Sequence, residues 1–151
     1  MAQGKGTTVN PDNFFVSTDD AYLNVPWVVL QIKGAYWGGW RSPELIERSL
    51  KNSLCFGLYF RDAGEPGTGP GRNVQVGFAR VVGDETTVSW ICDVVIDERY
   101  QHSGLGRFLM DALLAHPAVA KTVCILRTRD RHEFYRKFGF EMVDSMRRIP
   151  K

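Results

Sequence analysis

The stretch TVSWICDVVIDERYQHSGLGRFLMDALLAHP, residues 87–117, decides the fold of this chain. It begins as a strand-like apolar run, passes a turn that contains Gly104 and Gly106, and continues as a run of helix-favouring apolar residues. Such a turn has two interpretations. It is either a plain connection between a strand and a helix, or a backbone surface that holds phosphates, because glycine lets a ligand approach the main chain.

The helical run after the turn carries one apolar stripe, which predicts that this helix packs on a sheet. The stripe consists of Leu105, Leu109, Ala112, Leu113 and His116. The helix would then begin at the C-terminal edge of the preceding strand, where open sheets bind ligands. Its first backbone N–H groups have no partner inside the helix, and Arg107 adds a positive charge beside them. The glycines by themselves leave both interpretations open.

The composition is that of a single folded domain. The chain has 151 residues, of which 44% are hydrophobic and 12% aromatic, enough for one sizeable core. Its 19 Lys and Arg residues nearly balance its 17 Asp and Glu residues. Because these charges are also scattered, the sequence argues against a dedicated nucleic-acid or membrane surface.

Targeting and metal-binding signals are weak. The N-terminal residues lack the apolar run of a signal peptide, and no stretch approaches about 18 consecutive apolar residues. The three cysteines, Cys55, Cys92 and Cys124, lie in separate apolar runs. Their odd number and wide spacing predict free thiols in a reducing compartment rather than disulfides or a zinc site. We therefore expect a cytoplasmic domain that uses no metal and binds neither nucleic acid nor membrane.

Local signals predict the order of the elements. Residues 1–13 are expected to form a flexible N-terminal tail, and residues 14–151 one domain. Strands are expected at 14–20, 53–60, 74–82, 87–97, 122–128 and 140–144. Helices are expected from Asn24 to about Ala35, from Ser42 onward, over 104–116 and over 131–138. The Gly/Pro-rich segment 64–71 is expected to be a mobile hairpin loop without a phosphate role, since no helix follows its glycines.

The last helix and the sheet have further signatures. Asp130 and Glu133 have the spacing of a capping box, and Gly139 fits a left-handed helix stop with Phe140 placed for the accompanying apolar contact. Antiparallel hairpins come first along the chain, and a crossover between two parallel strands follows. The pattern predicts an α+β fold with a mixed, mainly antiparallel sheet.

The glycine turn, residues 101–107, matches neither a Walker A loop nor the dinucleotide-binding pattern. Its order, Gln101-x-x-Gly104-x-Gly106, resembles the pyrophosphate loop of the GNAT superfamily of N-acetyltransferases. The apolar strand end before the loop agrees, and EFYRKFGF at 133–140 resembles the family's Phe-Tyr-x-x-x-Gly-Phe segment. The resemblance covers residues 86–144. It implies helices on both faces of the sheet, an acceptor-side half at about 14–85 and an acetyl-CoA-binding half at about 86–144.

The resemblance implies acetyl-CoA as the cosubstrate. Pantetheine would pair with the backbone of a splayed strand at Val94, Val95 and Ile96. The pyrophosphate would sit on the amides of the glycine turn, which comprises Gln101, His102, Ser103, Gly104, Leu105, Gly106 and Arg107.

The sequence departs from the family pattern at two positions: Gln101 replaces the commoner Arg, and Glu98 replaces a frequent Pro. One positive charge fewer is expected to weaken anion binding without abolishing it.

Two residues are candidates for proton transfer. Tyr135 matches the family tyrosine that lies near the coenzyme sulfur and can protonate the departing thiolate; the alternative is a tyrosine at the edge of the core. An alkylamine must lose a proton before it attacks a thioester, and Asp93 is the first candidate base. Strict strand alternation puts Asp93 on one face with Ile91 and Val95. The alternative is a structural acid that pairs with an arginine such as Arg80.

The resemblance implies that the region between the first two helices lines the acceptor pocket. The alternative is that one or two of its aromatic residues simply cap the core. Tyr36, Trp37 and Trp40 cluster between the first two expected helices, and aromatic walls suit a hydrophobic or aromatic amine. His132 and His102 are weaker proton-transfer candidates, and His132 is the one that could reach the cleft. We expect direct acetyl transfer to a primary amine of a small molecule. A protein lysine or N-terminal acceptor, or an acyl-CoA-binding module without turnover, remain alternatives, and a homodimer is possible.

Overall fold

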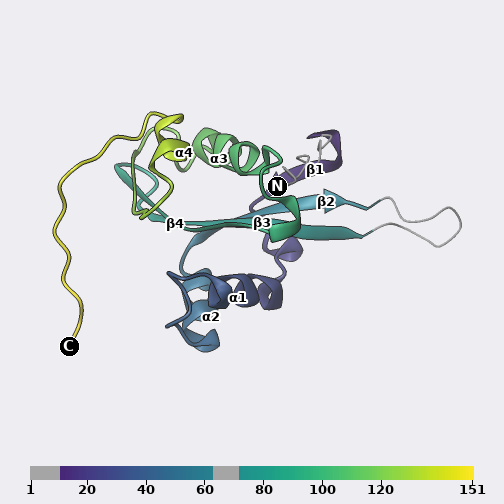
Figure 1. The fold of residues 1–151 in the computed structure, drawn as a ribbon, viewed down its shortest axis with the longest axis horizontal. Helices are drawn as coiled ribbons and strands as arrows, with labels where there is room; N and C mark the ends of the chain where they lie inside the picture. The colour runs from purple at the N-terminus through teal and green to yellow at the C-terminus, as the bar shows by residue number, and fades with distance from the viewer. Residues whose placement is uncertain (1–10, 63–71) are drawn as a thin grey trace, which may run out of the picture.

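A five-stranded sheet lies between two layers of helices (Figure 1). The computed structural model describes residues 11–62 and 72–151. The strands are β1 (Phe14–Ser17), β2 (Leu54–Arg61), β3 (Asn73–Gly83), β4 (Val88–Ile96) and β5 (Val123–Leu126), and they lie in the order β1-β2-β3-β4-β5. The first three pairings are antiparallel and β4 pairs with β5 in parallel. The predicted α+β fold with a mixed sheet and a parallel crossover is therefore confirmed.

Two helices cover each face of the sheet (Figure 1). The helices are α1 (Val25–Gly34), α2 (Pro43–Lys51), α3 (Leu105–Ala115) and α4 (His132–Arg136). The first two begin where their capping residues predict. Asn24 accepts a hydrogen bond from the amide of Trp27, and the Ser42 hydroxyl accepts one from the amide of Leu45. These side chains satisfy N–H groups that the first turn of a helix leaves unpaired.

Each helical layer has its own apolar core. Leu105, Leu109 and Leu113 of α3 are buried against one face of the sheet, as the stripe in the sequence predicts. Val28 and Ile32 of α1 are fully buried on the opposite face. Burial of such side chains contributes roughly 1.5–3 kcal/mol each. The sheet is thus held from both sides, and its strand ends are free to form a site.

A β-bulge interrupts β4 at Asp93. Phe78 pairs with Val95 and Arg80 with Cys92, so two residues of β4 oppose one residue of β3 between these pairs. Asp93 has a φ of 53°, in the left-handed region that Asp enters more readily than most residues. The expected strict alternation is therefore wrong beyond this point.

The bulge moves the end of β4 out of the expected alternation. Val94 and Ile96 join Ile91 against the α3 layer, and Val95 packs with the α1 layer. We expected Val94 and Ile96 on the other face of the sheet from Ile91. This expectation is wrong, because an inserted residue reverses the alternation of side chains along a strand.

Two further expectations differ from the structure, and two others lie wholly or partly outside the described residues. Residues 140–144 form no strand. The Asp130–Glu133 capping box does not form: Arg131 is the N-cap residue of α4 without a side-chain cap, and the Thr128 hydroxyl accepts a hydrogen bond from its amide. Of the expected N-terminal tail, residues 1–10 lie outside the described part, and Pro11–Asn13 form a 3-10 turn. The expected loop at 64–71 also lies outside it. Gly139, with a φ of 88°, is the predicted left-handed stop.

Candidate functional site

The pairing between the two parallel strands ends halfway along β4. Pairing between β4 and β5 covers only Val88–Ile91 and Val123–Leu126. Beyond this point, the main chain of β4 has no strand partner on the β5 side within the described residues. Val94, Val95 and Ile96, where the resemblance predicts a splayed strand, lie in this unpaired part of β4. An extended ligand arm could add to this exposed backbone in the manner of a strand.

The glycine turn presents free backbone amides at the end of β4. Gly104 is the N-cap residue of α3, with a φ of 86° and no side-chain cap. None of the amides from His102 to Arg107 donates a hydrogen bond to any described residue, and the first bond of the helix runs from Phe108 to Gly104. His102 also has a positive φ, 60°. Successive amides in such a geometry form a concavity that attracts anions.

The polar side chains of the turn are directed back to the protein. Gln101 donates from Nε2 to the carbonyl of Ile96 at 3.2 Å, and the Ser103 hydroxyl donates to the carbonyl of Tyr100. The Gln101 amide is itself bonded to the carbonyl of Glu98 at 3.4 Å, so the open amides begin at His102. Arg107 is 70% exposed and lies 3.7 Å from Asp111. None of these side chains is therefore hydrogen-bonded to the open amides of the turn.

The two glycines of the turn have different environments. A Cβ atom on Gly104 would meet nothing within 4 Å, but the left-handed φ strains any other residue there. A Cβ atom on Gly106 would lie 3.4 Å from the ring of Phe134, an ordinary contact. Gly104 is thus required by the backbone, whereas the space at Gly106 also accommodates an alanine side chain.

Tyr135 lies on α4 and packs, partly buried, against the core on the α3 side of the sheet. Burial raises the pKa of its hydroxyl to about 12, so the group is protonated at neutral pH. The hydroxyl has no hydrogen-bond partner among the described residues, although Tyr36 and Asp130 both act on it electrostatically. The Tyr36 hydroxyl donates to Asp130 at 3.3 Å. This contact brings the loop after α1 to the loop before α4.

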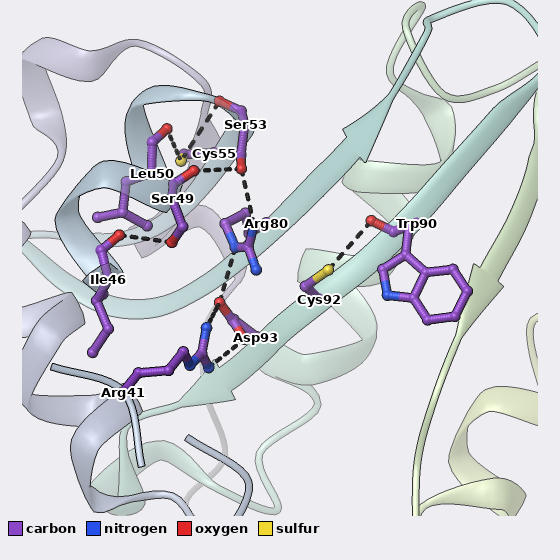
Figure 2. A network of polar contacts seen from close by, with 10 residues as sticks. All are labelled: Arg41, Ile46, Ser49, Leu50, Ser53, Cys55, Arg80, Trp90, Cys92 and Asp93. Atoms are coloured by element: carbon purple, nitrogen blue, oxygen red, sulfur yellow. Dashed lines mark hydrogen bonds and ion pairs between the residues drawn. The ribbon is translucent and has the colours of Figure 1, made fainter. Parts of the chain in front are cut away.

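Asp93 is held by two arginines, as Figure 2 shows. Arg41 donates to both carboxylate oxygens, at 3.0 and 2.8 Å, and Arg80 donates to one of them at 2.9 Å. The carboxylate is only 6% exposed. Burial raises the pKa of Asp93, but hydrogen bonds from Arg41 and the charge of Arg80 outweigh it, and the net pKa is lowered. These contacts match the structural alternative for Asp93 and make the carboxylate a weak base.

Arg41 is the residue that sequence reasoning missed. It precedes the cap of α2 and is 8% exposed, and its guanidinium lies 5.7 Å from the ring of Trp37 and 5.8 Å from that of Trp40. Between a glycine turn and a helix cap, an arginine resembles an ordinary solvated residue. Asp93 itself indicated that a cation such as Arg41 must lie nearby, because a carboxylate among apolar strand residues needs an opposite charge.

The predicted acceptor residues differ in exposure. Tyr36 and Trp40 are 56% and 77% exposed, and Trp37 is half-buried. Arg129 lies over the Tyr36 ring at 3.9 Å. His132 does not join this group: it lines an open cavity of about 410 Å³ with Asp130, Glu133, Arg136 and Met142. Asp130 connects the two places through its bond with Tyr36.

The described residues contain neither a candidate metal site nor a candidate membrane span. Residues 11–62 and 72–151 contain no group of three or more His, Cys, Asp or Glu side chains placed to hold a metal ion. Over the same ranges, no helix has both the length and the apolar character needed to cross a membrane.

Comparison with known proteins agrees with the geometry. Residues 65–142 match the model of the acetyltransferase (GNAT) domain. A Gibberella zeae protein assigned as an acetyltransferase is 31% identical over 142 residues, which cover 85% of this chain and 80% of that protein.

Solved structures have the same fold. A Xanthomonas campestris protein assigned to the GNAT family superimposes with a TM-score of 0.74 at 28% identity and covers 91% of this chain and 94% of its own. A GNAT family acetyltransferase from Elizabethkingia anophelis, solved with acetyl-CoA bound, has a TM-score of 0.62 at 19% identity. That match covers 88% of this chain and 79% of the other.

Proposed function

Because the chain belongs to the GNAT superfamily of acetyltransferases, we propose that it transfers the acetyl group of acetyl-CoA directly to a primary amine of a small molecule. The observation that carries the proposal is the run of unpaired amides from His102 to Arg107 at the start of α3. It lies beside a strand whose outer backbone is also free. Acetyl-CoA joins a diphosphate to an extended, amide-containing arm. The diphosphate fits the free amides of the turn, and the arm fits the unpaired backbone of β4.

The glycine turn would bind the diphosphate. Its amides carry partial positive charge, and the dipole of α3 adds to it. Arg107, the exposed last residue of the turn, supplies a full charge. Gln101 contributes no charge, so the backbone provides most of the binding. We expect the affinity to fall with added salt less steeply than in a site made of several arginines.

The splayed end of β4 would orient the thioester. Main-chain groups at Val94, Val95 and Ile96 would pair with the amides of the pantetheine arm, which explains why these positions carry ordinary apolar side chains. The cosubstrate supplies a reactive acyl carbon and a thiolate leaving group. Attack by the neutral amine forms the C–N bond and breaks the C–S bond.

Tyr135 would assist the leaving thiolate. Its hydroxyl is protonated and has no partner among the described residues, so it is free to donate a hydrogen bond to sulfur. A thiol has a reference pKa of about 8.5, well below that of this tyrosine. Complete proton transfer from Tyr135 is therefore uphill, and its main contribution is to stabilise developing negative charge on sulfur.

The proton of the amine would leave through water. Both oxygens of Asp93 are already engaged by arginines, and its pKa is lowered. Its proposed role is to position the bulge of β4 and the loop that carries Trp37 and Trp40. These rings, with Tyr36, would form the wall that contacts an aromatic or hydrophobic amine.

A thiol-release assay with acetyl-CoA tests the proposal. The acceptor panel would contain aralkylamines, polyamines, amino acids, aminoglycosides and histone peptides. We expect the highest kcat/KM with an aralkylamine. A preference for the peptides would support a protein acceptor instead. Acetyl-CoA binding without turnover on any member would favour a binding module.

Binding is measured separately by thermal unfolding. We expect acetyl-CoA to raise the Tm and free adenosine to leave it unchanged, because the phosphates and the pantetheine arm supply most of the contacts. Equal shifts with both compounds would contradict the proposed site.

A further inference from the structure

Asp130 follows β5 at the edge of the sheet where the proposed thioester site lies. Because β4 and β5 are parallel, their carboxyl ends lie at the same edge. β5 ends at Leu126, and the loop 127–131 leads from it to α4. In this loop the Thr128 hydroxyl accepts a hydrogen bond from the Arg131 amide at 3.0 Å. This bond spans Asp130 and orders the turn that carries it.

Asp130 neither caps α4 nor pairs with an arginine in the described part of the chain. The N-cap residue of α4 is Arg131, without a side-chain cap. No ion pair within residues 11–62 and 72–151 includes Asp130, although Arg129 and Arg131 are its neighbours in the sequence.

The carboxylate of Asp130 has one oxygen to spare. Its Oδ1 accepts the hydrogen bond from the Tyr36 hydroxyl at 3.3 Å, and its Oδ2 accepts none from a described residue. The residue is also exposed. An ionised carboxylate offers about four acceptor positions on its two oxygens. Asp130 therefore retains the capacity to bind a donor from outside the chain.

Asp130 contacts the aromatic wall of Tyr36, Trp37 and Trp40 and lies within electrostatic reach of Tyr135. The contact with the wall is the Tyr36 hydrogen bond. Burial is the main cause of the raised pKa of Tyr135, and the charge of Asp130 raises this pKa further. Such an effect requires a short distance. The free oxygen thus belongs to the region where the acceptor and the departing thiolate are proposed to meet.

We propose that Asp130 binds the ammonium group of the acceptor, a primary alkylamine, while the organic part of the acceptor contacts the aromatic wall. The inference rests on the proposed function and names the residue that selects a cation. An alkylammonium has three N–H donors, and its bond to a carboxylate is charge-assisted. Arg129, stacked on the Tyr36 ring, is exposed, so solvent and salt screen its repulsion.

Acetylation removes this interaction. The bound ammonium releases one proton to water before attack. A second proton leaves the nitrogen as the C–N bond forms, and it neutralises the thiolate released when the C–S bond breaks. The product amide has no charge and a single N–H, so its hydrogen bond to Asp130 is weaker than that of the ammonium. Asp130 therefore discriminates the amine from its acetylated product.

Titration calorimetry with coenzyme A, which lacks the acetyl group, tests the proposal without turnover. We expect 2-phenylethylamine to bind the enzyme–coenzyme A complex about 10-fold more weakly in Asp130→Asn than in wild type. Asn keeps an oxygen for the Tyr36 hydroxyl but lacks the charge. N-acetyl-2-phenylethylamine should bind equally to both proteins. In steady-state kinetics the KM for the amine should rise by a similar factor, with little change in kcat or in acetyl-CoA affinity.

Two further variants separate charge from structure. Glu133→Gln removes another exposed carboxylate, which pairs with Arg136, and should leave amine affinity unchanged. Tyr36→Phe removes the hydrogen bond to Asp130 but keeps the carboxylate and the ring, and should weaken amine binding less than Asp130→Asn does. Equal losses in Tyr36→Phe and Asp130→Asn would mean that the link between the loops matters rather than the charge, which overturns the inference.

The remaining outcomes separate this inference from the proposed function. Acetyl transfer with an amine affinity that Asp130→Asn leaves unchanged overturns the inference alone. Amine binding that depends on Asp130, without acetyl transfer from acetyl-CoA, supports the ammonium site and overturns the proposed function. A wild-type protein that does not bind 2-phenylethylamine overturns the inference.

Discussion

Arg41 and Asp93 are joined by two hydrogen bonds, of 3.0 and 2.8 Å, across 52 residues of sequence. These two hydrogen bonds connect the loop after α1 to the bulge of β4. Arg80 completes the cluster and reaches Ser53 at 3.0 Å, which joins it to the end of α2 (Figure 2). One carboxylate thus holds together the aromatic wall and the strand that would carry the cosubstrate.

Asp93→Asn is expected to lower the free energy of unfolding by about 3 kcal/mol, because it leaves two buried guanidinium groups without a counter-charge. The left-handed φ itself is tolerated by Asn. Urea denaturation of both proteins measures the difference. Asp111→Asn is the matched control, since Asp111 is 62% exposed and 3.7 Å from its arginine, and little change is expected there. Equal effects of the two substitutions would contradict a structural role for the cluster.

The same carboxylate predicts a pH dependence. Folding lowers the pKa of Asp93, so its contribution to stability is complete above the unfolded value of about 3.9. That contribution is lost as the pH falls through the lower folded value. We expect the difference in unfolding free energy between wild type and Asp93→Asn to shrink below about pH 4. A difference that stays constant to the acid limit would show that the ionised carboxylate is not its source.

Alanine is expected to separate the roles of the two glycines. Gly104→Ala should lower the unfolding free energy by about 1 kcal/mol and weaken acetyl-CoA binding, because a left-handed φ strains any side chain. Gly106→Ala should leave stability unchanged or raise it by up to about 1 kcal/mol, since alanine favours helix and its Cβ meets Phe134 at an ordinary distance. Denaturation and isothermal titration measure the two effects. If Gly106→Ala lowered the unfolding free energy more than Gly104→Ala, the described geometry of the turn would be wrong.

Tyr135→Phe is expected to lower kcat about 100-fold, the lower end of the range for loss of one hydrogen-bond donor to a developing anion. Acetyl-CoA affinity should change little, because the ring and its contacts with Phe134 and Phe140 remain. Steady-state kinetics and titration calorimetry provide the two values. Tyr22→Phe, a substitution of an exposed tyrosine on the β1 side, is the control. An unchanged kcat in Tyr135→Phe would remove this hydroxyl from the mechanism.

The rate of the wild-type enzyme should rise with pH up to about pH 10. An alkylamine attacks only after it loses its proton, and its fraction in the neutral form grows up to a pKa near 10. Tyr135 stays protonated over this range because its pKa is raised to about 12. A kcat/KM profile from pH 6 to pH 10 should therefore show one ascending limb. A descending limb between pH 8 and pH 10 would mean that the essential acid has an ordinary pKa.

The sequence by itself determined the elements whose cause is local. Caps at Asn24 and Ser42, the left-handed Gly139 and the stripe of α3 depend on residues within a few positions of one another. The resemblance between residues 86 and 144 identified the family for the same reason, since the motifs are short and contiguous. Failures of local prediction occurred at 130–133 and 140–144, where competing contacts decide whether a cap or strand forms.

Only the tertiary structure decided which distant groups meet. Asp93 finds Arg41 52 positions away, and Tyr36 reaches Asp130 94 positions away. The bulge of β4 is invisible in the sequence because a one-residue insertion is defined by the partner strand, and it reverses the faces of Val94 and Ile96. Such features depend on the burial and charge pairing of elements far apart in the chain, which no window of neighbouring residues encodes.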